Sequence, residues 1–433
     1  MALLLVVSAC TTSSSSSTTT AQPGVTTTQG SGTTTSSPVE STTTSQPPVT
    51  TTTPDLSGVT GISDEVKAQL EQIIKDAQQV RGLPFISPPV ITVVSDTELE
   101  DRVRAEIVKE TADFPADEAL YKMLGLLAED ADFEQIVLDL YGEQVAGFYD
   151  GETGEIVVPA REDGFSIIQR ATLLHEMVHA LTDQHFSFHP AYEQMLDEER
   201  LDEATAYQAL IEGDATLAEV QWIRTLSQRE LGEFVAESLD IDSSTLDASP
   251  RFLQESLLFP YDTGLAFVQD IHAGGGWSAV NDAYSELVDL PGSSEQVITP
   301  TDYMHDLPVQ VDIPDVDVPG YTLERTSTWG EEGFRIMLNQ GSGVSTMARA
   351  ADGWGGDSYH QWFDGENAAM MIVYEGDSAT DVNELETALL GFIDDGYPED
   401  NFASVDRLGG SLYFIASDVP EVGEAIRSAV GLG

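Results

Sequence analysis

Apolar residues recur at helical or strand spacing along most of the chain after residue 63. Repeats at i, i+3, i+4 and i+7 indicate one apolar face of a helix, whereas short β-branched runs or strict alternation indicate strands. Helices are therefore predicted at residues 64–80, 97–110, 117–128, 132–141, 167–185, 193–226, 261–286 and 381–394. Strands are predicted at residues 90–94, 144–149, 155–158, 368–374 and 411–416. The mixture predicts an α+β fold.

Turn-forming residues divide this pattern into larger units. The strands at 144–149 and 155–158 flank Asp150-Gly151-Glu152-Thr153-Gly154, which predicts a β-hairpin. A connection rich in Pro and Asp near residues 300–319 separates the helix-rich part from a mixed remainder. We therefore expect one domain over residues 58–310 and an α+β region over residues 311–433.

The beginning of the chain has a different composition. Residues 1–10 are an apolar run that ends in small residues and Cys10, the single cysteine, which resembles the lipobox of bacterial lipoproteins. Residues 11–57 are almost entirely Thr, Ser, Pro, Gly and Gln, so they predict a disordered stalk. We expect an extracytoplasmic protein, either lipid-anchored at the cell membrane or secreted, that touches the membrane through its anchor only.

The net charge limits the possible partners. The chain has 75 Asp plus Glu against 18 Lys plus Arg, a formal net charge of -57. Such a field repels nucleic acid and anionic lipid headgroups. Nucleic acid is therefore not expected as a partner, and we expect a monomer.

One motif carries recognisable chemistry. His175-Glu176-Met177-Val178-His179 is an HExxH sequence inside the predicted helix 167–185, where Ser166 and Gln169 form a capping box at the start. Residues i and i+4 share one helix face, so His175 and His179 can both bind one Zn²⁺ at about 2.0–2.1 Å. Glu176 can then accept a proton from water at the metal and pass it to the leaving amine. The alternative is a helix with merely packed histidines, which leaves buried imidazoles unpaired.

A catalytic zinc site needs a third protein ligand. Glu212, 33 residues after His179, is the first choice. Gly213 lies beside it in a helical pattern, where glycine costs about 1 kcal/mol relative to alanine. The glycine therefore suggests close approach of another backbone, such as that of the HExxH helix.

Other carboxylates on the same predicted helix differ from Glu212 either in the helix face on which they lie or in their position along the helix axis. Glu203 lies nine residues earlier and points to the opposite face. Glu219 shares the face but lies about 10 Å further along the axis, too far to bind the same ion. Asp214 points away from Glu212 and would at most support a ligand. The alternative for all of them is a solvated acidic helix face.

These motifs resemble the gluzincin clan of zinc metallopeptidases, in which a downstream Glu in an E-G-x-A context is the third zinc ligand. The resemblance implies a zincin-like fold, with a helical active-site domain and a small upstream sheet. The chain also resembles a group of uncharacterised bacterial exported proteins over residues 140–300, with a fainter continuation to about 375. The stretches that match are residues 142–150, 174–186, 212–216, 259–261, 275–281, 294–296 and, more weakly, 353–357.

The same resemblance assigns expected roles to residues around the metal. A strand upstream of the HExxH helix, 144–149 or 155–158, would bind substrate backbone by edge pairing. Tyr261 is the first choice for stabilising the oxyanion, with Tyr149 and His305 as alternatives. Asp183, one turn beyond His179, either orients an imidazole or has no role in the site. Ordinary packing is the alternative for each tyrosine.

The expected function is hydrolysis of peptide bonds in a peptide or protein substrate, as an endopeptidase, with Zn²⁺ as cofactor. No Gly-x-Met-x-Asn motif of exopeptidases is present. Two alternatives stay open. One is a non-catalytic surface-displayed binding protein on a zincin fold, and the other is a zinc hydrolase with a non-peptide substrate.

Overall fold

The computed structural model describes residues 56, 59–109, 114–142, 147–161, 163–284, 290–340, 347–394 and 397–433. The proposed lipobox, the stalk apart from Leu56, and residues 144–146 of the predicted strand 144–149 lie outside these residues. Leu56, inside the expected stalk, is buried in the first hydrophobic core. Helices and strands together confirm the α+β fold. Within the described segments, no helix combines the length and the apolar character that crossing a membrane requires.

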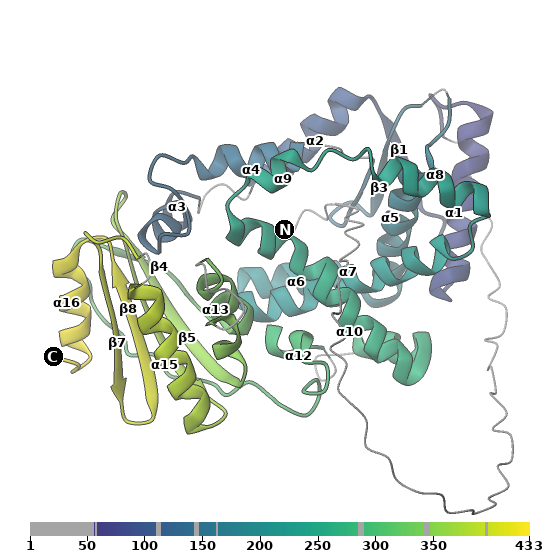
Figure 1. The fold of residues 1–433 in the computed structure, drawn as a ribbon. Helices are drawn as coiled ribbons and strands as arrows, with labels where there is room; N and C mark the ends of the chain where they lie inside the picture. The colour runs from purple at the N-terminus through teal and green to yellow at the C-terminus, as the bar shows by residue number, and fades with distance from the viewer. Residues whose placement is uncertain are drawn as a thin grey trace, which may run out of the picture.

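The elements are numbered as in Figure 1. The helices are α1 Asp64–Arg81, α2 Asp96–Lys109, α3 Phe114–Met123, α4 Phe133–Gly142, α5 Ile167–Phe186, α6 Phe188–Asp197, α7 Leu201–Ile223, α8 Gln228–Ser238, α9 Ser244–Ala248, α10 Arg251–Tyr284, α12 Ser294–Ile298, α13 Gly330–Leu338, α15 Ala379–Asp394 and α16 Pro420–Ala429, with a 3-10 turn η1 at Arg349–Ala351. The strands are β1 Val90–Val94, β2 Phe148–Asp150, β3 Glu155–Pro159, β4 Thr322–Ser327, β5 Trp354–Phe363, β6 Ala368–Gly376, β7 Phe402–Leu408 and β8 Ser411–Ser417.

The small upstream sheet has the order β1-β3-β2. The predicted hairpin is present, since β2 and β3 are antiparallel with Tyr149 opposite Ile156, and β1 runs parallel to β3 on the other side. Because β3 has a neighbour on both sides, its backbone has no free edge for a peptide. The alternative that residues 155–158 bind substrate by edge pairing is therefore wrong, and β2 is the edge strand of the hairpin.

The helices of the N-terminal part share one core. Apolar side chains from α1, α5, α7 and α10 meet there, including Ile74, Leu174, Leu210 and Phe267. Ser63 caps the start of α1, since its Oγ accepts a hydrogen bond from Val66 N–H at 3.2 Å. Figure 1 shows α1 and α5 on the side of the molecule away from the C-terminal sheet, with α7 and α10 between them and that sheet. The HExxH helix α5 lies inside this group.

The predicted single helix over 193–226 is two helices, α6 and α7. The chain between them includes Glu199 in the left-handed region at φ 55°. Contacts with β4 hold this break, because Thr326 N–H donates to Glu199 Oε2 at 3.1 Å and Leu201 N–H donates to Ser327 Oγ at 3.2 Å. A tertiary contact therefore ends a pattern that is helical by sequence.

The C-terminal part is built on a second sheet of order β4-β5-β6-β8-β7, antiparallel throughout. Helix α16 packs against one face, with the core that contains Met371 and Ile415. The other face carries α13, α15 and the upstream helix α3 over the core that contains Phe334, Met370 and Leu120. The sheet begins after the expected boundary at 310/311, but its core continues into the upstream helices.

Candidate metal centre

Helix α5 presents the two histidines of the HExxH motif. The predicted capping box starts this helix, since Gln169 N–H donates to Ser166 Oγ at 3.4 Å and Ser166 N–H donates to Gln169 Oε1 at 3.0 Å. Apolar neighbours surround the motif, and His175 is only 1% exposed while His179 is 0% exposed. Two imidazoles are thus held one helical turn apart inside the core.

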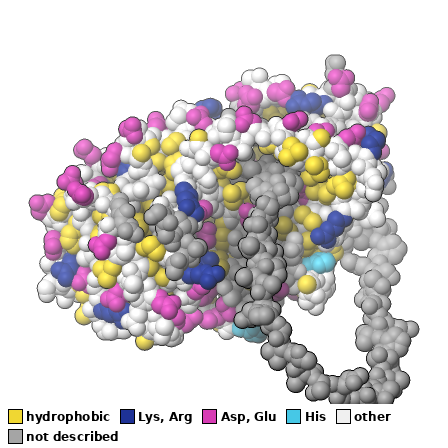
Figure 2. All heavy atoms as spheres, in the orientation of Figure 1, with side chains coloured by type: hydrophobic (Ala, Val, Ile, Leu, Met, Phe, Trp, Pro, Cys, Tyr) yellow, Lys and Arg dark blue, Asp and Glu magenta, His cyan; other side chains and the backbone are white. Residues whose placement is uncertain are grey.

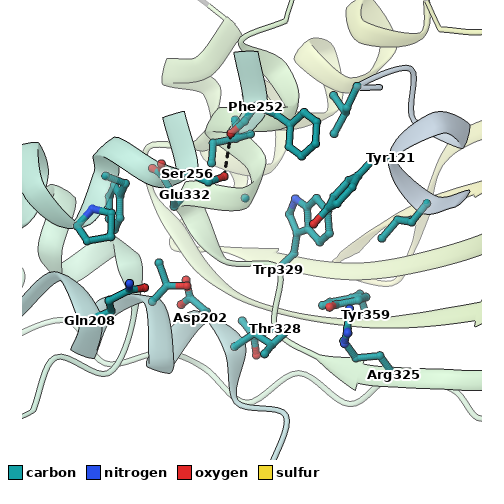
Figure 3. Close-up of a pocket in the computed structure, with 18 residues that line it drawn as sticks. Tyr121, Asp202, Gln208, Phe252, Ser256, Arg325, Thr328, Trp329, Glu332 and Tyr359 are labelled. Atoms are coloured by element: carbon teal, nitrogen blue, oxygen red, sulfur yellow. Dashed lines mark hydrogen bonds between the residues drawn. The ribbon is translucent and has the colours of Figure 1, made fainter. Parts of the chain in front are cut away.

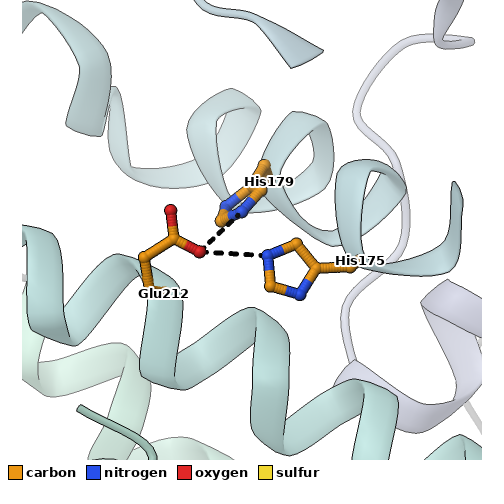
Figure 4. A group of neighbouring side chains, drawn as sticks. All are labelled: His175, His179 and Glu212. Atoms are coloured by element: carbon orange, nitrogen blue, oxygen red, sulfur yellow. Dashed lines mark hydrogen bonds and ion pairs between the residues drawn. The ribbon is translucent and has the colours of Figure 1, made fainter. Parts of the chain in front are cut away.

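Helix α7 brings Glu212 to the same point. Its Oε2 lies 3.0 Å from His175 Nε2 and 3.5 Å from His179 Nε2, as Figure 4 shows. One ligand atom from each of the three residues lies within 4.8 Å of the others. Atoms at 2.0–2.1 Å from a tetrahedral zinc lie about 3.3 Å apart, so the two measured distances bracket that spacing. The three side chains could therefore hold a metal ion.

The polar atoms of this cluster are incompletely satisfied by protein groups. Both ring nitrogens of His179, Oε1 of Glu212 and Oε1 of Glu176 are buried without a hydrogen-bond partner in the described structure. A buried polar group left unsatisfied costs about 1–3 kcal/mol. A cation bound between two imidazole nitrogens and a carboxylate would satisfy His179 Nε2, and this donor set matches that of catalytic zinc sites.

Glu176 is fixed against the small sheet. Its Oε2 accepts a hydrogen bond from the backbone N–H of Tyr149, on the edge strand β2, at 2.7 Å. Its Oε1 is the oxygen without a partner. One carboxylate oxygen therefore orients the side chain, and the other remains available for proton transfer.

Burial and neighbouring charges set the protonation of the cluster. Burial lowers the pKa of His179, which favours the neutral imidazole that a metal needs. Burial also lowers the pKa of His175, but hydrogen bonds with Glu212 and Glu219 outweigh it and raise that pKa to about 10. Burial raises the pKa of Glu212, yet its electrostatic interaction with the nearby His179 and a hydrogen bond with His175 lower it overall. Burial raises the pKa of Glu176 to about 8.

Glu219 has a position that the sequence did not predict. Its Oε2 lies 3.5 Å from His175 Nδ1, the ring nitrogen that points away from Glu212. Helical rise separates Glu219 from Glu212, as expected, but it places the carboxylate behind the first imidazole. A carboxylate on the second ring nitrogen fixes the tautomer and orientation of a metal-binding histidine.

Asp214 lies behind the centre rather than in it. It forms an ion pair with the buried Arg81 of α1 at 2.6 Å and accepts a hydrogen bond from Tyr284 Oη at 3.1 Å. The Arg81 guanidinium in turn lies 4.5 Å from the ring centre of Trp277. This buried group joins α1 and α10 to the segment of α7 that carries Glu212.

The close backbone approach expected at Gly213 is present, but its partner is α10 rather than the HExxH helix. A Cβ at Gly213 would lie 2.1 Å from the carbonyl oxygen of Gly264, and a Cβ at Gly264 would lie 2.2 Å from that of Ala209. Only glycine fits at such a crossing. The crossing also brings Tyr261, three residues before Gly264, toward the metal centre.

The candidates for oxyanion stabilisation lie at different places. The ring centre of Tyr261 is 6.2 Å from that of His175, so the structure brings this tyrosine beside the cluster. The Oη of Tyr149 donates to Asp183 Oδ2 at 2.7 Å. Asp183 also accepts from the His189 backbone N–H at 3.0 Å, so its hydrogen bonds go to neither His175 nor His179. His305 is exposed.

Comparison with known proteins covers the C-terminal part alone. Residues 320–427 match a family described as a domain of unknown function, DUF8575. No curated protein and no solved structure matches the chain. The match begins just before β4 and ends within α16, so it corresponds to the second sheet with its helices.

Proposed function

We propose that the chain is a zinc-dependent endopeptidase of the HExxH type, similar to gluzincins, in which His175, His179 and Glu212 hold the ion. The observation that carries the proposal is the convergence of these three buried donors beside Glu176. A merely structural His–Glu cluster has no need of a second carboxylate with an unpartnered oxygen. The zincin-like fold belongs to the same proposal.

The residues of this chain would then divide the work as follows. A bound zinc ion supplies Lewis acidity, which polarises a carbonyl and lowers the pKa of water. Glu176 takes the proton at Oε1 while its Oε2 stays bonded to Tyr149 N–H, and later delivers that proton to the leaving amine. Glu219 holds His175 in orientation, and Tyr261 donates toward the developing oxyanion.

One observation favours a second candidate. The side chains of His175, Glu176, His179 and Glu212 are each exposed by 1% or less, as in structural metal sites that are closed to substrate. A non-catalytic binding protein with a structural metal is therefore the alternative. A zinc hydrolase with a non-peptide substrate is the other, because the metal chemistry does not specify the substrate.

The location is part of the proposal. Cys10 in its lipobox-like context and the Ser/Thr-rich stalk favour display outside a bacterial cell on a lipid anchor. Peptides or proteins at the cell surface are then the accessible substrates.

Glu176→Gln tests the proposal directly. The variant keeps the three donors, so it should retain about one zinc per chain, while cleavage of casein or a peptide library falls by about 10²- to 10⁴-fold because the general base is lost. Metal content is measured by elemental analysis and cleavage by fluorescence release.

Exposed Glu366 offers the matched control, since Glu366→Gln removes the same charge far from the motif in sequence and should leave both quantities unchanged. Stoichiometric zinc with no cleavage by the wild type would favour the alternatives. A wild type without stoichiometric metal would overturn the zinc assignment itself.

A further inference from the structure

A pocket of about 290 Å³ lies where the helical part meets the C-terminal sheet. We call it the aromatic pocket and define it by six of its lining residues. They are Tyr121, Asp202, Phe252, Trp329, Glu332 and Tyr359. Figure 3 shows Asp202 and Glu332 on the side of the helices, and Trp329 with Tyr121 and Tyr359 toward the sheet. The match to DUF8575 includes the lining residues that the sheet region contributes.

Residues of α7 and α10 that lie close in sequence to the metal centre also line the aromatic pocket. Gln208 lines it from α7, four residues before Glu212, so one helical turn of about 6 Å separates them along the axis. Pro260 lines it from α10 and directly precedes Tyr261, whose ring is beside His175. An extended peptide advances about 3.3 Å per residue, so a side chain two residues from a bond at the metal reaches the pocket.

Aromatic rings form its walls. Trp329 and Tyr359 pack edge to face with ring centres 5.4 Å apart, and Tyr121 and Phe252 are tilted at 4.5 Å. The faces of such rings attract cations as well as apolar groups. The walls therefore accept a long side chain with an apolar stem and either a neutral or a positive end.

The charged groups around the pocket determine whether a side chain with a neutral end or one with a positive end fits better. Arg325, the guanidinium at the pocket, pairs with Asp117 at 2.8 Å and donates to Gln361 at 3.1 Å, so its charge is already compensated. Arg335 pairs with Glu331 and Asp352, both at 2.6 Å, rather than with Glu332. The acidic groups that line the pocket are Asp202 and Glu332. Burial raises the pKa of Asp202 to about 7 and that of Glu332 to about 8, so a cation bound beside them would favour their charged forms at neutral pH.

Backbone hydrogen bonds hold this arrangement in place. Asp357 accepts from Trp329 N–H at 2.7 Å and from Gly330 N–H at 2.9 Å, which fixes the start of α13. Ser294 Oγ accepts from Glu332 N–H at 3.1 Å, and Ser294 N–H donates to Asp202 at 3.2 Å. Ser294 therefore connects the backbone of Glu332 on α13 to the carboxylate of Asp202 on α7 across the junction.

We infer that the aromatic pocket binds a basic side chain, lysine or arginine, of a peptide whose backbone reaches the metal centre. The inference rests on the proposed peptidase function for its role as a specificity subsite. The aromatic faces take the stem and the cation, and Glu332 and Asp202 pair with the charged end. The net charge of -57 also attracts basic peptides to the molecule.

Binding to the zinc-loaded Glu176→Gln protein tests the pocket without requiring cleavage. Fluorescein-labelled peptides that differ at one position, with arginine, lysine, norleucine or glutamate, are titrated by anisotropy. Arginine and lysine peptides should bind about tenfold more tightly than the norleucine peptide, as expected for one charge-assisted contact. Adding Glu332→Gln should remove most of this ratio, whereas adding Glu324→Gln, an exposed glutamate on β4 outside the pocket, should preserve it.

The outcomes separate the two proposals. Equal binding of the four peptides, or tighter binding of norleucine or glutamate, overturns the pocket assignment. A basic preference that persists in Glu332→Gln, with the melting temperature unchanged, also overturns it. A basic preference that Glu332→Gln removes, in a protein whose wild type cleaves none of these peptides, supports the pocket and overturns the peptidase.

Discussion

His175 has a carboxylate at each ring nitrogen, Glu212 at Nε2 and Glu219 at Nδ1. Only one of these atoms can face a metal shared with His179, and the distances assign that atom to Nε2. If a metal binds as proposed, the carboxylate near Nδ1 would have a different role, because it would favour a proton on that nitrogen and leave the lone pair of Nε2 for the ion. The orientation of one ring therefore depends on two positions of α7.

Glu219→Gln tests this role at the level of a single residue. The amide keeps the shape but orients the imidazole less strongly, so zinc affinity should fall by about 10- to 100-fold. Competition with a chromogenic chelator measures it. Glu203→Gln, on the same helix and paired with Arg200 at its start, is the control and should leave the affinity unchanged. Equal zinc affinity in all three proteins would show that Glu219 does not support the ligand.

Helical phase, together with Gly213 beside the carboxylate, favoured Glu212 over Glu203 and Glu219, and the structure groups Glu212 with both histidines. Helical phase depends only on the 1.5 Å rise and the turn angle. It was not sufficient to find the contact between Glu219 and His175. That contact depends on how α7 and α5 cross, which no local pattern specifies. The same limit explains why Asp183 remained open, since its partners Tyr149 and His189 lie on other elements.

At the scale of elements, the crossing of α7 and α10 positions the site. Gly213 and Gly264 allow the two backbones to touch, and this contact sets how far Tyr261 stands from His175. Small residues at a helix crossing permit an approach that any Cβ would prevent. The helices that carry the third donor and the candidate oxyanion donor are therefore placed by two glycines.

The variant Gly264→Ala tests that crossing. Gly274→Ala, on the same helix, is the matched control. The first places a Cβ 2.2 Å from the Ala209 oxygen, so we expect a loss of about 1–3 kcal/mol in the free energy of unfolding and weaker metal binding. The second meets nothing within 4 Å, and replacing an exposed helical glycine should stabilise by about 0.5–1 kcal/mol. Urea denaturation measures both. Equal effects would rule out steric contact as the cause.

Sequence patterns predicted elements best where the pattern was long and local. Helices α1 and α5 and strand β1 lie close to their predicted ranges, because their apolar faces and caps are encoded within each segment. Strands β4, β5 and β7 were not predicted. The exposed Thr322-Leu323-Glu324 and the half-buried β7 show little alternation, so only their pairing in the sheet makes them strands.

At the scale of the molecule, acidity is both a surface and an interior property. Asp and Glu side chains outnumber Lys and Arg over the face seen in Figure 2. Carboxyl groups are also buried at the junction of the helical part and the second sheet, where Asp202, Glu295, Glu331 and Asp357 are each 5% exposed or less. Burial raises their pKa values, to about 7, 9, 7 and 6 respectively. The junction is therefore most stable when these groups are protonated.

This predicts that the metal-free protein loses stability as pH rises. Each group has a higher pKa folded than unfolded, so its contribution is complete below about pH 4 and is lost as pH rises through about 6 to 9. In EDTA, the melting temperature at pH 8.5 should lie at least about 5 °C below that at pH 5.5.

Glu295→Gln should reduce this difference between the two melting temperatures, and Glu366→Gln should not. Because buried groups are screened little, 0.5 M NaCl should raise both temperatures yet leave a difference between them. A difference that salt abolishes would instead assign the effect to repulsion among surface charges.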